Sequence, residues 1–329
     1  MNRPLLSLLL LWSIPCPAPA AAPPDATSQA IRRGLDRLQM GATRYTEKRQ
    51  CFSCHHQALT VAAFAEAKSR GFAVDEAFIK DQVAFTLDTF RPKLAQVRKG
   101  QAVPGGNTMS GYALFTLQKG GHAADATTSA LVEYLLQRQA ADGGWPAIMP
   151  RPPSEGSTFT NTAHAIQALT HYGPHEKASV VVRIDKAVGK GKAWLKSHEP
   201  TTTEDRVFHL HGLAFSKLDT EKARLDLERE QLPDGSWAQI AKIPGDAYAT
   251  AGVLLALRAS GTKKTDASYR RGIAYLLRTQ NADGSWIVTT RSRPVQTFFD
   301  NGDPGGKSQF ISFAATGWAT WALIDSMAE

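Results

Sequence analysis

The residues best suited to chemistry are two cysteines and two histidines that stand together at residues 51–56, Cys-Phe-Ser-Cys-His-His. In the pattern Cys-x-x-Cys-His, the two thiols form thioethers with a haem and the adjacent imidazole ligates its iron. We therefore expect Cys51, Cys54 and His55 to hold a c-type haem. Met109 is a candidate for the second ligand of the iron.

Two other roles remain open for this segment. In an oxidising compartment, Cys51 and Cys54 would close a short disulfide that caps a helix. Alternatively, the two thiols together with His55 or His56 would hold zinc and leave one position open for a water that the metal activates. The segment is therefore a haem site, a disulfide or redox pair, or a metal site.

Further histidines are candidates for a second ligand or for the wall of a cavity. His164, His209 and His211 lie in Ala- and Leu-rich segments, where a histidine is more often a core residue than a ligand. His56 is a further candidate, but consecutive residues of a helix point about 100° apart. We therefore expect His56 to face away from whatever His55 binds.

The elements that must position these residues are repeats. The sequence Gln-x-x-Asp-Gly-Ser/Gly-Trp occurs three times, beginning at Gln139, Gln231 and Gln280. In each copy, Asp-Gly supplies a turn that accepts a positive φ, and the tryptophan is a large apolar anchor with one N–H to satisfy. Because an apolar run at helical spacing precedes each copy, one helix is predicted to end at each motif.

Six Ala- and Leu-rich helical segments alternate with six more charged, amphipathic ones. The Ala-rich segments are residues 57–64, 110–117, 162–169, 207–218, 250–257 and 316–323. The charged segments that precede them are residues 28–40, 75–97, 124–139, 180–197, 220–231 and 268–280. Small residues allow close packing inside and charged faces suit the outside. The sequence therefore predicts an all-α fold, an α/α toroid of six helical hairpins in a single domain over residues 21–329.

Two long loops rich in proline and glycine, residues 146–160 and 291–307, are expected at one rim of the toroid. Loops of this length in a compact domain are more often functional than idle. A central cavity is expected to open between them. The side chains expected to line it are those of His56, Tyr112, His164, His209, Tyr248, Phe313 and Trp318.

Residues 1–20 have the form of a secretory signal peptide, with a short apolar core at residues 5–14 and small residues after it. The core is too short to span a bilayer, and nothing comparable follows. We therefore expect an extracytoplasmic protein, periplasmic or secreted, that does not span the membrane. The net charge of +8 is spread along the chain rather than gathered in a stripe, so nucleic acid is not an expected partner.

The repeated motif resembles the hallmark of the squalene-cyclase and prenyltransferase-repeat superfamily, and the resemblance covers nearly all of the chain after residue 20. It implies an α/α toroid whose inner helices surround a cavity for isoprenoid substrates. Cyclases of that superfamily that protonate an alkene carry Asp-x-Asp-Asp before a Thr-Ala pair. Here Thr-Phe-Thr-Asn precedes Thr162, and only Asp246 remains before Thr250. The acid of the cyclases is therefore missing from these positions.

We expect an exported binding or redox module, with the haem beside a central cavity that admits an apolar or polymeric ligand. One alternative is a toroidal enzyme, either a terpenoid-type transferase or cyclase or a polysaccharide lyase, whose cysteine pair is a disulfide or part of a metal site. The rim-loop candidates for a lyase are Arg151, Arg291, Asp300 and Asp303. The other alternative is a scaffold that presents its rim to another protein.

Overall fold

The computed structural model describes residues 24–149, 151–293 and 298–327. The expected signal peptide at residues 1–20 lies outside this range. Within the described residues every regular element is a helix, and the β-structure is limited to one isolated bridge between Trp237 and Asp246. The all-α class is therefore confirmed.

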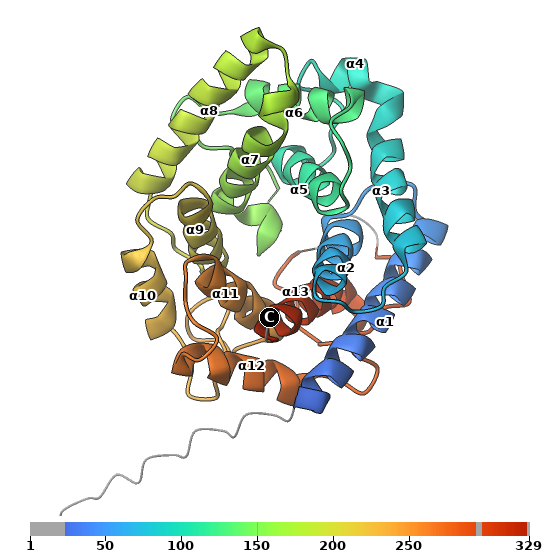
Figure 1. Cartoon of the computed structure of the whole chain (residues 1–329), viewed down its shortest axis with the longest axis vertical. Helices are drawn as coiled ribbons and strands as arrows, with labels where there is room; N and C mark the ends of the chain where they lie inside the picture. Colours follow the sequence, from blue (N-terminus) through green and yellow to red (C-terminus); the bar gives the residue numbers. More distant parts are fainter. Residues whose placement is uncertain (1–23, 150, 294–297, 328–329) are drawn as a thin grey trace, which may run out of the picture.

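Outer and inner helices alternate along the chain and form two concentric rings (Figure 1). The outer ring contains α1 (Pro24–Lys48), α3 (Glu76–Phe90), α6 (Ala126–Arg138), α8 (Ala178–Ser197), α10 (Glu221–Arg229) and α12 (Ala267–Thr279). The inner ring contains α2 (Leu59–Ser69), α5 (Gly106–Lys119), α7 (Thr158–Tyr172), α9 (Thr203–Phe215), α11 (Ala247–Ala259) and α13 (Gln309–Ser326). The toroid of six hairpins is confirmed.

The two rings differ in burial as their compositions predict. In α11, the small side chains of Ala251 and Ala256 are fully buried, and most of the helix is enclosed by its neighbours. In α10, Leu227 is the one buried residue, because this outer helix packs along a single face. Apolar burial on the shared faces of neighbouring hairpins is therefore the main force that holds the ring together.

The repeated tryptophans join each outer helix to the inner helix that follows it. Trp145, Trp237 and Trp286 are at most 1 % exposed. Their indole N–H groups donate to the carbonyl oxygens of Leu135, Leu227 and Leu276, at 2.7–2.9 Å. Their backbone N–H groups donate to the Oγ1 atoms of Thr162, Thr250 and Thr316. Each tryptophan thus satisfies its own polar groups while it fills the space between two helices.

The repeated glutamines join each outer helix to the next outer helix. Gln139 donates to the carbonyl oxygen of Ala187 in α8, and Gln231 donates to that of Ser268 in α12. Gln280 uses the same contact to reach Ala30 in α1, at 2.8 Å. The contact that spaces the hairpins therefore also closes the ring between its last and first outer helices.

The segment at residues 75–97, predicted as one helical element, is divided. α3 ends at Phe90, a 3₁₀ turn (η2, Arg91–Lys93) contains Pro92, and a single turn of helix follows (α4, Leu94–Val97). The break is expected at this place because proline lacks a backbone N–H and its ring clashes with the preceding turn. The prediction of one continuous helical element was wrong only at this proline.

The close approach at the Asp-Gly turns gives the first testable prediction. Gly284 has a φ of +83°, and a Cβ at this residue would overlap the carbonyl oxygen of Arg33 in α1. Gly261 has a φ of +96°, but a Cβ there would meet nothing within 4 Å. We expect Gly261→Ala to lower the free energy of unfolding by about 1 kcal/mol through the backbone conformation alone. Gly284→Ala should cost a further ~1–3 kcal/mol because α1 must shift.

Urea unfolding of the natural chain and of both variants measures the difference in unfolding free energy between Gly284→Ala and Gly261→Ala. Because both variants place alanine at a positive φ, this difference reports the contact with α1. Equal losses at the two positions would show that α1 does not pack closely on the Gly284 turn.

Candidate functional site

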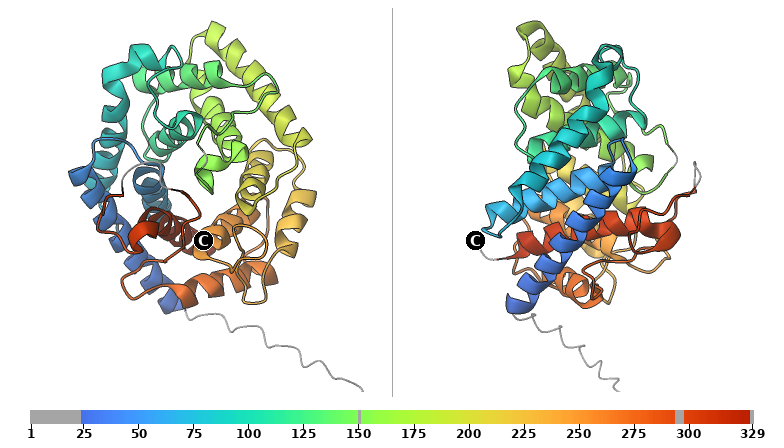
Figure 2. Two further views of the ribbon diagram at one scale, coloured as in Figure 1. Left: turned by 180° about the vertical axis from the view of Figure 1, so that it is seen from behind. Right: turned by 90° about the vertical axis from the view of Figure 1, so that its right-hand side faces the viewer.

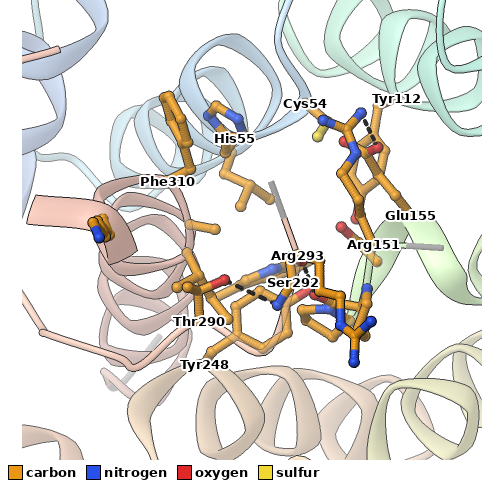
Figure 3. A pocket seen from close by; sticks show the side chains of 18 of the residues that line it. Cys54, His55, Tyr112, Arg151, Glu155, Tyr248, Thr290, Ser292, Arg293 and Phe310 are labelled. Atoms are coloured by element: carbon orange, nitrogen blue, oxygen red, sulfur yellow. Dashed lines mark hydrogen bonds and ion pairs between the residues drawn. The ribbon is translucent and has the colours of Figure 1, made fainter. Parts of the chain in front are cut away.

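A cavity of about 590 Å³ lies at the centre of the ring. The inner helices line it together with residues of the two long loops, and the side chains that the inner helices supply are mainly apolar or aromatic. They include Leu59, Tyr112, Tyr248, Phe310, Ile311, Ala314 and Trp318. Figure 3 shows Tyr112, Tyr248 and Phe310 of this set around the open centre. The volume and the apolar lining are typical of a site for a small molecule or cofactor.

Residues of the two long loops are part of the cavity lining, as predicted. Figure 2 shows the loops on one side of the ring. The hydroxyl group of Ser292 donates to the carbonyl oxygen of Pro152, at 2.6 Å, and so joins the two loops. Arg151, Arg293 and Lys307 from these loops are among the lining residues. Arg151 forms an ion pair with Glu155, while Arg293 and Lys307 are exposed. An apolar cavity with cationic groups at its border suits a ligand that carries negative charge.

Cys54 and His55 face the cavity from the start of the first inner helix. The chain enters this helix through a short π-helical turn (η1, Cys54–Ala58), and the Ser53 side chain caps it by accepting from the backbone N–H of His56. Cys54 is 7 % exposed and lies beside the ion pair of Arg151 and Glu155, as Figure 3 shows. Burial raises the pKa of the Cys54 thiol, which therefore stays protonated at neutral pH.

The ring of His55 packs against Phe310, with 5.0 Å between ring centroids. Burial and, second, the neighbouring His56 hold the pKa of His55 well below its usual value. His55 is therefore a neutral imidazole, the form that ligates a metal.

His56 turns away from the cavity, as expected for the residue after His55. Its Nδ1 lies 2.7 Å from Nδ1 of His55, and its Nε2 lies 2.8 Å from Oδ2 of Asp303. The other carboxylate oxygen of Asp303 accepts from Arg37, at 2.8 Å. Burial acts to raise the pKa of Asp303, but hydrogen bonds from His56, Asn301 and Arg37 hold it below its usual value. The carboxylate is therefore ionised.

Cys51 does not line the cavity. It is exposed, and its Sγ lies 3.5 Å from the hydroxyl oxygen of Tyr45. Cys51 and Cys54 are both free thiols in this structure, so the disulfide is not formed here. Over the described residues, no three His, Cys, Asp or Glu side chains are arranged so as to hold a metal ion. This arrangement gives the zinc hypothesis no support.

Of the side chains predicted to line the cavity, Tyr112, Tyr248 and Trp318 do so. His56 and Phe313 do not, because they stack on each other behind the wall, at 4.0 Å between ring centroids.

His164 and His209 are also absent from the wall. His164 packs among Tyr112, Phe115 and Phe208. His209 lies near the carbonyl oxygen of Leu195, within hydrogen-bonding distance at 2.8 Å, on the outer side of its helix.

The predicted second ligand, Met109, is half-buried and packs against the inner-helix core rather than the cavity. The four lyase candidates do not converge either. Asp303 is engaged by Arg37 and His56, and Arg291 donates to Gln239.

Sequence reasoning missed a buried acid next to the cavity. Glu204 is 6 % exposed and accepts hydrogen bonds from Thr160, at 3.0 Å, and from the hydroxyl of Tyr248, at 3.1 Å. It escaped notice because the inner segment was predicted to begin at residue 207, whereas α9 begins at Thr203. The signal was the pair Thr202 and Asp205, which forms a capping box and marks the true start of the helix.

The environment of Glu204 gives a prediction on stability against pH. Burial raises its pKa from 4.5 to about 7, and the hydrogen bonds from Thr160 and Tyr248 oppose the shift. The folded chain therefore holds this proton more tightly than the unfolded chain, so stability falls as pH rises from about 4.5 to about 7. At ~1.4 kcal/mol per pKa unit, the loss is about 3 kcal/mol.

Glu204→Gln removes this loss, because the amide stays neutral. Relative to the natural chain, the variant should therefore gain about 3 kcal/mol between pH 4.5 and pH 8 in urea unfolding. Glu199→Gln is the control, since the side chain of Glu199 is 82 % exposed. A gap between the Glu204 variant and the natural chain that stays constant across this pH range would contradict the assignment.

Residues 207–328 match the family model of the squalene-hopene cyclase C-terminal domain. A drimenyl diphosphate synthase from Streptomyces showdoensis is 28 % identical over 190 residues, which cover 53 % of this chain and 34 % of that protein. The chain therefore matches about a third of the length of that relative. No helix in the described part of the chain is long and apolar enough to cross a membrane.

Two solved structures share the fold across 91–92 % of this chain. One is a variant of the type II terpene cyclase MstE from Scytonema in complex with geranylgeranyl dihydroxybenzoate, with a TM-score of 0.56, 13 % identity and 99 % of that chain covered. The other is a glycosidase in complex with glucose, with a TM-score of 0.55, 12 % identity and 98 % covered. The resemblance to the squalene-cyclase-like superfamily is thereby confirmed: the chain has the α/α-toroid fold of that superfamily, and its C-terminal part matches a squalene-hopene cyclase domain.

Proposed function

We propose that the protein is an exported c-type haem protein, a binding or redox module whose haem is attached at Cys51 and Cys54, ligated by His55 and enclosed by the central cavity. One observation carries the proposal. The Cys-x-x-Cys-His segment opens onto the central cavity, and Cys54 and His55 are part of the wall. Two thiols at this spacing beside a histidine form the attachment pattern for haem.

Three properties of the site support this proposal. His55 is neutral, so it offers a lone pair to iron. The cavity of about 590 Å³ has apolar walls, which suit a flat, largely apolar cofactor. Arg151, Arg293 and Lys307 border the cavity and would pair with the carboxylates that a haem carries. Cys51 is the exposed thiol of the two, so it would attach to the cofactor from outside the cavity wall.

A haem bound here would supply one-electron chemistry or the binding of a small ligand at iron. The second role is favoured, because the described residues of the wall include neither methionine nor a second histidine. The chain itself would exclude bulk water with Phe310, Ile311 and Trp318, and would pack the rings of Tyr112 and Tyr248 against a bound molecule.

A terpenoid-type ligand is the second candidate, because the same wall is apolar and the same border is cationic. A long apolar molecule with an anionic head group would match both features. The relationship to a drimenyl diphosphate synthase is consistent with this candidate. In that case Cys51 and Cys54 would serve as a redox pair rather than as attachment sites.

The deciding measurement is the mass of the tryptic peptide of residues 50–68, from protein exported by a host with active cytochrome c maturation. Each thiol would add across one vinyl group of the haem, so no atom is lost and the peptide should gain the full mass of the cofactor. We expect an adduct on this peptide and a haem absorption spectrum from the intact protein. Cys51→Ser should retain at most one thioether.

Protein made without the maturation system is the matched control and should yield the peptide without the adduct. An unmodified peptide from the competent host would contradict the haem proposal. In that case, a peptide lighter by two hydrogens would identify a disulfide and favour the terpenoid-type ligand.

A further inference from the structure

The outer helix α8 presents an exposed basic face on the outside of the ring, between α6 and α10 (Figure 1). We propose that this face is a docking surface for an acidic, helical segment of another protein. The inference goes beyond the proposed function, because it does not depend on what the central cavity holds.

The first observation is the charge of α8. The net charge of +8 is spread along the chain as a whole, but the 20 residues of α8 contain five cations and a single acid, Asp185. Arg183 is paired with Glu133 of α6, at 2.8 Å. Within the described residues, no carboxylate pairs with the other four cations, which are Lys186, Lys190, Lys192 and Lys196. These lysines are therefore free to pair with carboxylates from outside the chain.

The neighbouring helix α10 shows that unpaired cations are not a general property of the outer ring. Lys222 and Arg229 both pair with Asp226. Arg224 pairs with Glu228, at 2.9 Å. The cations of α10 are therefore compensated by acids of the same helix, whereas those of α8 are not.

The exposed face of α8 has a flat centre. Val182, Gly189 and Ala193 follow one line along the helix, because residues four and seven positions apart share a face. Val182 is 70 % exposed, which makes it the most exposed large apolar side chain among the described residues. Since successive residues turn by about 100°, the lysines flank this line, with Lys186 and Lys190 on one side and Lys192 and Lys196 on the other.

Gly189 has no packing role within the chain. At Gly191, a Cβ would lie 2.8 Å from the ring of Trp145, so the close approach of α8 to the core requires glycine there. At Gly189, a Cβ would meet nothing within 4 Å. Glycine weakens a helix interior, so its presence at this exposed position calls for another reason. The close approach of a partner's backbone would supply one.

The uncompensated charge is confined to the width of one helix. On the side of α6, Glu133 neutralises Arg183. On the side of α10, the repeat motif is absent between α8 and α9, and a cavity of about 500 Å³ lies between the end of α8, α9 and α10. Its lining contains four cations and four acids, so the positive face ends there. A bilayer or a nucleic acid duplex is wider than this face, whereas a single helix matches it.

A second copy of this chain is a poor match for the face, because two chains with a net charge of +8 repel each other. The partner is therefore a different, acidic protein. Its helix would place small or apolar side chains on the line of Val182, Gly189 and Ala193, and carboxylates over the lysines on both sides.

The test uses a synthetic helical peptide as the probe, with alanine and leucine along one face and glutamate on both sides of that face. Its binding to the full chain is followed by fluorescence anisotropy. We expect binding that weakens as salt is raised. Lys186→Gln, Lys190→Gln and Lys196→Gln together should raise the Kd about tenfold, because three exposed ion pairs are lost.

Lys80→Gln, Lys242→Gln and Lys263→Gln together are the matched control, because they remove the same charge from exposed lysines elsewhere. This control should keep the Kd within about twofold of the natural chain. Gly189→Gln tests the close approach. Its side chain would block the central line and raise the Kd, while the fold should be no less stable, because a better helix former enters open space.

Equal losses of affinity in the two triple variants would overturn the inference, as would the absence of peptide binding to the natural chain. Vesicles that contain phosphatidylglycerol provide the comparison with a membrane. Binding to these vesicles that depends on the α8 lysines and is tighter than binding to the peptide would assign the face to a membrane and contradict a protein partner.

Discussion

Closure of the ring between the last and the first hairpin is the constraint on which the rest of the structure depends. A single hairpin cannot bury both of its faces, so each relies on two neighbours, and an open ring would leave two faces bare. The gap is closed by Gln280, which bonds to Ala30, and by the Asp-Gly turn that packs on α1. The same closure brings Asp303 to His56 across 247 residues of sequence, so the architecture of the ring and the geometry of the site depend on one contact region.

Burial determines how the titratable groups in and behind the cavity wall behave. Burial disfavours the charged form of each group, so it lowers the pKa of His55 and raises the pKa values of the Cys54 thiol and the Glu204 carboxyl. Asp303 is the exception, because three donors compensate its charge. The wall therefore consists mainly of neutral polar groups in an apolar surface, and the free positive charges stand at the border. Such an arrangement orients a bound molecule by its charged end while its apolar part is enclosed.

The fold could be predicted from the sequence because the same motif occurs three times. Each copy makes the same tryptophan and glutamine contacts. Tyr112, Tyr248 and Trp318 could be placed in the wall because they belong to the inner helices. The partnership of His56 with Asp303 could not be predicted, because it joins a helix start to an irregular loop with no periodic pattern. Glu204 was missed because a capping residue, and not hydrophobic spacing, sets the first turn of α9.

The segment at residues 51–56 lies far along the chain from Asp303 and α13, which pack against it. This distance in sequence has a consequence for how the protein matures. Cys51, Cys54 and His55 are synthesised early, whereas Asp303 and α13 come near the end of the described chain. Until that last hairpin docks, the side chains of α13 that line the cavity with Cys54 and His55 are not in place, whereas Cys51 is exposed even in the completed ring. A modifying enzyme would therefore meet its target in an incomplete ring, and the completed fold would then enclose what had been attached. If a haem is attached as proposed, the order of synthesis would separate its attachment from the closure of the site.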